Sequence, residues 1–235
     1  MQKIFLDPKN EEIFHRDGYL IIDILNNMDI KRLQSTYDMV KQQHSYDVVA
    51  SVVLSDLELR KYVNENISNI LIERILPILN NYKIILGSFV VKRASSENGK
   101  FPLHQDPTFI EEEEHVALSI WCPLVDVAIN NGCLGILPGS HRLKNYYRSP
   151  CMLPYTHMIG ILESDYIKYI PMKKGEVLFI NTRMIHGSPP NLSNSTRPVA
   201  AAVAIPNSLP VLCCYSDIEK IQVKPLCIKF QMTFI

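Results

Sequence analysis

Three residues with metal-ligand chemistry place the strongest constraint on this chain. His104 and Asp106 are separated only by Gln105, and His186 follows much later in the sequence. Side chains at positions i and i+2 of a strand point to the same side, so His104 and Asp106 can face one interior point. Two imidazoles and one carboxylate on one face of an ion form the ligand set typical of non-haem Fe(II) oxygenases. The triplet alone is also compatible with a buried, hydrogen-bonded histidine at a polar strand end.

Hydrophobic periodicity predicts helices first and strands afterwards. Apolar residues recur every three to four positions in 28–42 and 56–76, and a shorter helix is expected at 9–17, ending at Gly18. Short β-branched segments follow at 84–91, 115–127, 176–185 and 198–205, with a further candidate at 19–22. We therefore expect a single domain, with a helical part at about 1–82 packed on a β core at about 83–235.

Composition excludes several classes of partner. Lys plus Arg and Asp plus Glu number 24 each, so the formal net charge is zero. This balance favours neither nucleic acid nor an anionic membrane surface as a partner. No apolar run approaches the length of about 20 residues that a spanning helix needs. The six cysteines form no Cys-x-x-Cys pair, which is typical of reduced thiols and predicts a cytoplasmic protein.

Four motifs together resemble the phytanoyl-CoA dioxygenase family of Fe(II)/2-oxoglutarate oxygenases. They are Phe14-His-Arg-Asp-Gly-Tyr-Leu-Ile, His104-Gln-Asp106, Gly132-Cys-Leu-Gly-Ile-Leu-Pro-Gly-Ser-His141, and His186-Gly-Ser188 with Arg197 eleven residues after His186. The resemblance extends over about residues 10–205. It implies a mostly β fold with N-terminal helices, namely a double-stranded β-helix, a cupin-like jelly roll.

The resemblance also implies roles for individual residues. His104, Asp106 and His186 match the iron ligands, and Arg197 matches the arginine that binds the distal carboxylate of 2-oxoglutarate. The planar donor fork of arginine suits that carboxylate. Ser188 is expected to add a hydroxyl to the same carboxylate, or to be a turn residue before Pro189. Trp121 is expected to line the cosubstrate pocket, or to belong to the core.

The implied activity consumes 2-oxoglutarate and O2, releases succinate and CO2, and hydroxylates an unactivated C–H bond. The family's halogenases replace the carboxylate ligand by a small residue, so Asp106 favours hydroxylation, desaturation or ring formation. The expected substrate is a small metabolite, either free or tethered to a carrier protein. A cupin-like protein with another metal and a non-catalytic binding module remain the alternatives.

Three other polar features are expected to be structural. Lys92 is interpreted as a solvated residue at a strand end, with a role at the mouth of the site as the alternative. His141 is expected to make a structural hydrogen bond near its turn. The acidic run 111–114 is expected to be a solvated loop. The loop-like segments 93–115 and 142–170, with the N-terminal helices, are expected to determine substrate specificity.

Overall fold

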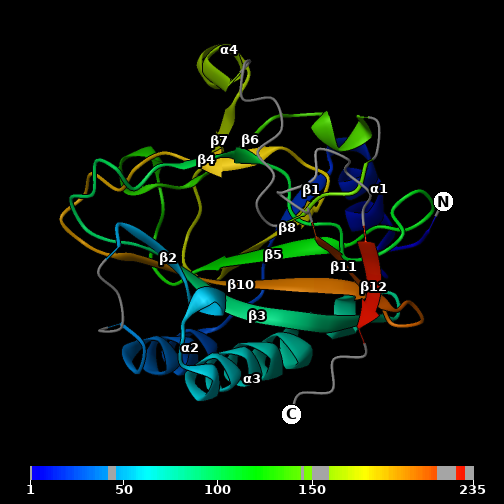
Figure 1. Ribbon diagram of the computed structural model, residues 1–235, viewed down its shortest axis with the longest axis horizontal. Coiled ribbons are helices and arrows are strands. Elements are labelled where there is room, and N and C mark those ends of the chain that lie inside the picture. Colours follow the sequence, from blue (N-terminus) through cyan, green and yellow to red (C-terminus); the bar gives the residue numbers. More distant parts are fainter. Residues whose placement is uncertain (1, 42–45, 144–145, 150–158, 216–225, 231–235) are drawn as a thin grey trace.

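Two facing antiparallel sheets form the centre of the molecule. A computed structural model describes residues 2–41, 46–143, 146–149, 159–215 and 226–230. The larger sheet has six strands and the smaller sheet has four, and they lie one above the other (Figure 1). This arrangement is the predicted double-stranded β-helix.

The large sheet alternates segments from distant parts of the chain. Its strand order is β1-β8-β5-β10-β3-β2, and every neighbouring pair is antiparallel. The strands are β1 (Tyr19–Asp23), β8 (Glu176–Asn181), β5 (Leu118–Pro123), β10 (Arg197–Pro206), β3 (Tyr82–Lys92) and β2 (Val48–Ala50).

The small sheet has the order β4-β9-β6-β7 and carries two of the three candidate ligands. Its strands are β4 (Phe101–His104), β9 (His186–Ser188), β6 (Leu134–Ile136) and β7 (Lys168–Ile170). A separate hairpin pairs β11 (Val211–Tyr215) with β12 (Leu226–Phe230).

The predicted helices are present, and each begins at a capping residue. Asp7 caps α1 (Pro8–Asp17), Asn26 caps α2 (Asn27–Asp38) and Asp56 caps α3 (Leu57–Arg74), each by accepting main-chain N–H bonds. Helix α1 ends at Gly18, whose φ of 78° is the left-handed conformation that glycine adopts without strain. The chain past α3 continues into a 3₁₀ turn, Leu76–Ile78, that contains Pro77.

The alternation of side chains along β10 separates the apolar clusters on the two faces of the large sheet. Ala200, Ala202 and Ala204 lie on the outer face, in a core shared with the N-terminal helices. Helices α2 and α3 cover this face of the large sheet (Figure 1). Val199 lies on the opposite face, in a second core between the sheets that includes Trp121. The space between the sheets therefore has an apolar lining.

Two expectations about element content need correction. Strand β1 confirms the strand candidate at 19–22, but the rest of the segment 1–82 is not only helical, because it also supplies β2 to one edge of the large sheet. The segment 142–170 is not all loop, because it includes α4 (Ile159–Asp165) and β7. Periodicity gave little signal for three-residue strands, which pair only in the tertiary context. Within the described residues, no helix is both long and apolar enough to cross a membrane.

Candidate metal centre and anion pocket

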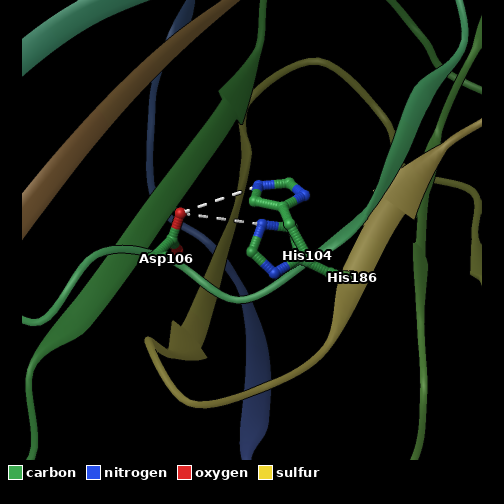
Figure 2. Close-up of side chains that lie close together, drawn as sticks. All are labelled: His104, Asp106 and His186. Carbon is green, nitrogen blue, oxygen red and sulfur yellow. Dashed lines mark ion pairs between the residues drawn. The ribbon is translucent and has the colours of Figure 1, made fainter. Parts of the chain in front are cut away.

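The fold brings His104, Asp106 and His186 together at the end of the small sheet. His104 closes β4, His186 opens β9, and the two residues are direct partners in the antiparallel register. Asp106 lies two residues past His104, and its Oδ1 is 3.9 Å from His104 Nε2 and 3.8 Å from His186 Nε2. All three donor atoms lie within 4.8 Å of one another. Figure 2 shows both imidazole rings turned toward the carboxylate, an arrangement that can hold one ion.

Main-chain carbonyls set the orientation of both imidazoles. His104 Nδ1 lies 2.9 Å from the Pro102 carbonyl oxygen, and His186 Nδ1 lies 2.9 Å from that of Met184. An Nδ1–H that donates to a carbonyl leaves the Nε2 lone pair free to bind a metal. Burial and the nearby His186 lower the pKa of His104 to about 4, so this ring is neutral at neutral pH. A neutral ring is the form that binds metal.

The carboxylate is oriented by a residue that sequence reasoning missed. Ser119 Oγ, on β5, donates a hydrogen bond to Asp106 Oδ2. This bond occupies Oδ2 and leaves Oδ1 as the oxygen that faces both histidines. A signal for Ser119 existed in the sequence, because it is a polar residue two positions before Trp121 on a strand face that is otherwise apolar.

Arg197 lies fully inside the molecule, and no acidic residue of the described chain pairs with it. It is 1% exposed, and its pKa is lowered to about 9 by burial. Its Nη1 donates to the Val90 carbonyl oxygen at 3.3 Å, while its Nε is buried without a hydrogen-bond partner. No described carboxylate forms an ion pair with it. A buried guanidinium with an unused donor is costly unless an anion binds there.

Trp121 lies beside this arginine. The Arg197 guanidinium carbon is 5.5 Å from the centroid of the indole ring, within the range of a cation–π contact. Trp121 is 7% exposed and belongs to the core between the sheets. The structure therefore places it both in the core and at the arginine, so its two predicted roles are not exclusive.

Lys92 is buried, and the prediction of a solvated strand-end lysine is wrong. It is 0% exposed and pairs with Arg197 across β3 and β10. Its Nζ donates to the carbonyl oxygens of Gly99 at 2.6 Å, Ser188 at 3.0 Å, and Pro189. Burial, reinforced by the charge of Arg197, lowers the pKa of Lys92 to about 7. The reason for the error is strand register, because the sequence does not show which face a strand-end residue occupies.

Ser188 shares the strand face of His186 by alternation along β9. Its carbonyl oxygen accepts from Lys92, so the strand that carries His186 is tied to β3 immediately beyond the histidine. This contact involves the main chain, and the predicted role of the Ser188 hydroxyl stays a prediction.

The Pro-Gly-Ser-His turn braces the segment that leads into His186. Ser140 Oγ accepts the N–H of Ile185 at 2.8 Å, and the Leu137 N–H donates to the Ile185 carbonyl at 2.8 Å. Among the described residues, neither buried ring nitrogen of His141 has a hydrogen-bond partner of ordinary geometry, although the main chain of His15 lies close.

The acidic run is solvated only in part. Glu111, Glu113 and Glu114 are exposed, but Glu112 is 2% exposed and forms an ion pair with Arg148 at 2.7 Å. The prediction of a wholly solvated loop is therefore wrong for Glu112. Its partner lies 36 residues away, and nothing in the local pattern distinguishes it from its neighbours.

Comparison with known proteins identifies the family of the chain. Residues 26–199 match the family model of phytanoyl-CoA dioxygenase (PhyH). A zebrafish (Danio rerio) protein named phytanoyl-CoA dioxygenase domain-containing protein 1 is 32% identical over 125 residues, which are 49% of this chain and 43% of that protein. The match thus covers less than half of the relative's length.

Solved structures of low identity share the fold. The α-ketoglutarate-dependent carbocyclase SnoK from nogalamycin biosynthesis superposes with a TM-score of 0.63 at 18% identity, covering 90% of this chain and 89% of SnoK. EctD from S. alaskensis, solved with 2-oxoglutarate and 5-hydroxyectoine, gives 0.60 at 19% identity, covering 90% and 85%. The family model spans most of the chain, including His104, Asp106, His186 and Arg197, and the chain belongs to the phytanoyl-CoA dioxygenase (PhyH) family.

Proposed function

We propose that this protein is an Fe(II)- and 2-oxoglutarate-dependent dioxygenase that hydroxylates a C–H bond of a small molecule. The observation that carries the proposal is the pairing of two sites in one interior. A cluster of two histidines and one carboxylate lies in the same inter-sheet space as a buried arginine with no described acidic partner. The cluster suits a metal ion. The arginine suits the far carboxylate of a dicarboxylic acid whose other end is bound to that ion.

The donor set supports iron. His104, Asp106 and His186 would hold the ion with two neutral nitrogens and one oxygen, which is the facial set of non-haem Fe(II) oxygenases. Such a set leaves coordination positions for a cosubstrate and O2. Ser119 would hold the unbound carboxylate oxygen, and the Pro102 and Met184 carbonyls would keep the imidazoles in their tautomers.

The arginine supports a dicarboxylate of limited length. Ser119 touches Asp106, and Trp121, two residues along the same face of β5, touches Arg197. Two residues of a strand span about 6.8 Å. A five-carbon 2-oxo dicarboxylate matches this step, with its 2-oxo acid end at the metal and its far carboxylate at Arg197. Lys92 adds positive charge beside the arginine, and the Ser188 hydroxyl is a further candidate donor.

Iron with 2-oxoglutarate would supply the oxidising chemistry, using O2 and releasing succinate and CO2. The chain's own residues would bind and orient these groups. The apolar inter-sheet core around Trp121, Val199 and Ile136 would keep water away from them. Retention of Asp106 supports hydroxylation over halogenation. The SnoK and SnoN structures are named as those of a carbocyclase and an epimerase, so cyclisation and epimerisation are the competing outcomes.

The proposed substrate is a small metabolite, free or carrier-tethered, in the cytoplasm. EctD was solved with 5-hydroxyectoine and HygX with hygromycin B, which supports small polar molecules as one class to screen. A screen that follows succinate release across metabolite pools would identify the substrate.

The metal site is tested by His186→Ala, with His141→Ala as a matched control. His141 is also a buried histidine, but it is not in the triad. Under anaerobic conditions, wild-type protein with Fe(II) and 2-oxoglutarate should develop a weak visible charge-transfer band, and His141→Ala should retain it. His186→Ala should lose both the band and tight metal binding.

Each contrary result identifies one of the alternatives. Wild-type protein that binds metal but not 2-oxoglutarate would be a cupin-like metalloprotein. Wild-type protein that binds neither would be a non-catalytic module. Unweakened, stoichiometric iron binding by His186→Ala would show that the ion is held elsewhere.

A further inference from the structure

The short segment 146–149 runs beside the loop that carries Asp106. Thr108 N–H donates to the Arg148 carbonyl at 3.0 Å, and Arg148 N–H donates to Thr108 Oγ1 at 3.0 Å. Tyr146 Oη donates to Gln105 Oε1 at 2.5 Å, next to both His104 and Asp106. The two segments are therefore joined by main-chain and side-chain bonds on both sides of Asp106.

The Arg148 guanidinium makes the most direct of these contacts. Its Nε donates to the main-chain oxygen of Asp106 at 2.7 Å. Its Nη2 donates to both carboxylate oxygens of Glu112, at 2.9 and 2.7 Å. Both side chains are 1% exposed, so this ion pair is shielded from water.

Glu112 closes the network on the other side of Asp106. Its Oε1 accepts the hydroxyl of Thr182 at 2.8 Å, and the Thr182 carbonyl accepts the N–H of Asp106 at 3.2 Å. The main-chain oxygen and the main-chain nitrogen of Asp106 are thus both held, one by Arg148 and one by Thr182. A closed ring of bonds surrounds the residue whose carboxylate faces the two histidines.

We propose that Arg148 is a positioning residue for the metal site: with Glu112 as its counterion, it fixes the main chain of Asp106 and thereby aims the carboxylate. This inference rests on the proposed function, since it assumes that the triad binds a metal. It also means that residues 146–149 have to be docked against the Asp106 loop before the site has full affinity.

The chemistry of arginine accounts for the residue type. Its planar fork can donate from Nε in one direction and from Nη2 in another, whereas a lysine ammonium cannot hold both acceptors in this geometry. A buried ion pair is often no more stabilising than apolar residues of the same volume, so stability alone is a weak reason for it. Outer contacts that orient metal ligands commonly change metal affinity by about 10–100-fold.

The test compares Arg148→Lys with Arg74→Lys. Arg74 also pairs with a buried carboxylate, that of Asp29 at 2.9 Å, but between α2 and α3. Each protein is titrated anaerobically with Co(II) alone, and the absorption spectrum of the bound ion is recorded. Thermal unfolding in EDTA is measured in parallel. A second variant, Arg148→Met with Glu112→Gln, removes the buried charges altogether.

We expect Arg148→Lys and the double variant to bind Co(II) at least about tenfold more weakly than wild type, with an altered spectrum. Arg74→Lys should keep the wild-type Co(II) affinity and spectrum, even if its unfolding temperature falls as much as that of Arg148→Lys. Wild-type affinity and spectrum in either Arg148 variant would overturn the inference. The inference would also fail if Arg74→Lys lost as much Co(II) affinity per degree of lowered unfolding temperature as Arg148→Lys does. Wild-type protein that binds no Co(II) would instead defeat the metal site itself.

Discussion

Ser119 donates its hydroxyl to Oδ2 of Asp106, and this bond decides which carboxylate oxygen faces the two histidines. Removing the hydroxyl frees the carboxylate to rotate about its χ2 angle. We expect Ser119→Ala to weaken Co(II) binding about tenfold, as is typical when an outer contact to a ligand is lost. Ser119→Thr keeps the hydroxyl and suits a strand, so it should restore the affinity. Equal affinities for the alanine and threonine variants would show that the bond does not orient the ligand.

Arg197→Met tests the anion pocket separately from the metal. The substitution keeps the length of the side chain and removes the charge. Losing a charge-assisted pair to a buried carboxylate costs several kcal/mol. We expect the apparent 2-oxoglutarate constant to rise at least about a hundredfold, or about 2.7 kcal/mol.

Metal affinity should be nearly unchanged in Arg197→Met, because no ligand is altered. Arg32→Met is the control, since Arg32 forms an exposed pair with Glu73 on the helical face. A wild-type 2-oxoglutarate constant in Arg197→Met would transfer the role to Lys92, the neighbouring buried cation.

Lys92 should make stability depend on pH. Its pKa is lowered from 10.5 to about 7 in the folded protein, so between these values the unfolded chain binds more protons than the folded one. The contribution of Lys92 to stability is therefore constant below about pH 7 and becomes more favourable as the pH rises from about 7 toward 10.5. The slope has an upper limit of about 1.4 kcal/mol per pH unit.

The measurement is urea unfolding of wild type and Lys92→Met at several pH values from 6 to 10. Above pH 7 the free energy of unfolding of wild type should increase relative to that of Lys92→Met. Below pH 7 the difference between the two free energies should stay constant. Lys83→Met is the control, because Lys83 also lies on β3 and donates to the carbonyls of Asn207 and Leu209, but near the surface. A difference between wild type and Lys92→Met that is flat up to pH 10 would contradict the prediction.

Gly18 and Gly139 form a matched pair that separates backbone strain from steric overlap. Their φ values are 78° and 80°, so alanine is strained at both. A Cβ at Gly18 would lie 2.3 Å from His141 Nδ1, whereas a Cβ at Gly139 meets nothing within 4 Å. Gly139→Ala should cost about 1 kcal/mol of unfolding free energy, and Gly18→Ala clearly more, because His141 has to move.

Thermal and urea unfolding would measure both glycine variants. Combining Gly18→Ala with His141→Ala should recover most of the excess cost, because only the flexible end of Met184, whose Cε lies 2.6 Å from the added Cβ, still has to move. Equal losses of unfolding free energy in Gly18→Ala and Gly139→Ala would contradict the prediction. They would mean that His141 and its turn at 138–141 can move away from residue 18 at no energetic cost.

The parts of the fold that the sequence predicted are those with local signals. Helix α1 has Asp7 before it and Gly18 after it, and Pro77 lies just past α3. The triad and Arg197 followed from spacing and from motifs shared with a known family. Lys92 and Glu112 could not be placed in this way, because their burial depends on partners far along the chain, Arg197 and Arg148 respectively. A charged residue in a loop has the same local pattern whether or not a distant partner covers it.

The interleaved order of the large sheet has a consequence for how the protein acquires its site. Tyr19 pairs with Ile180, Lys92 with Arg197 and His104 with His186, so each pairing waits for the last third of the chain. A topology dominated by such distant contacts folds slowly, because the loop-closure entropy is lost before the contacts form. The His104–His186 pairing therefore assembles the candidate metal site only once these distant segments have come together.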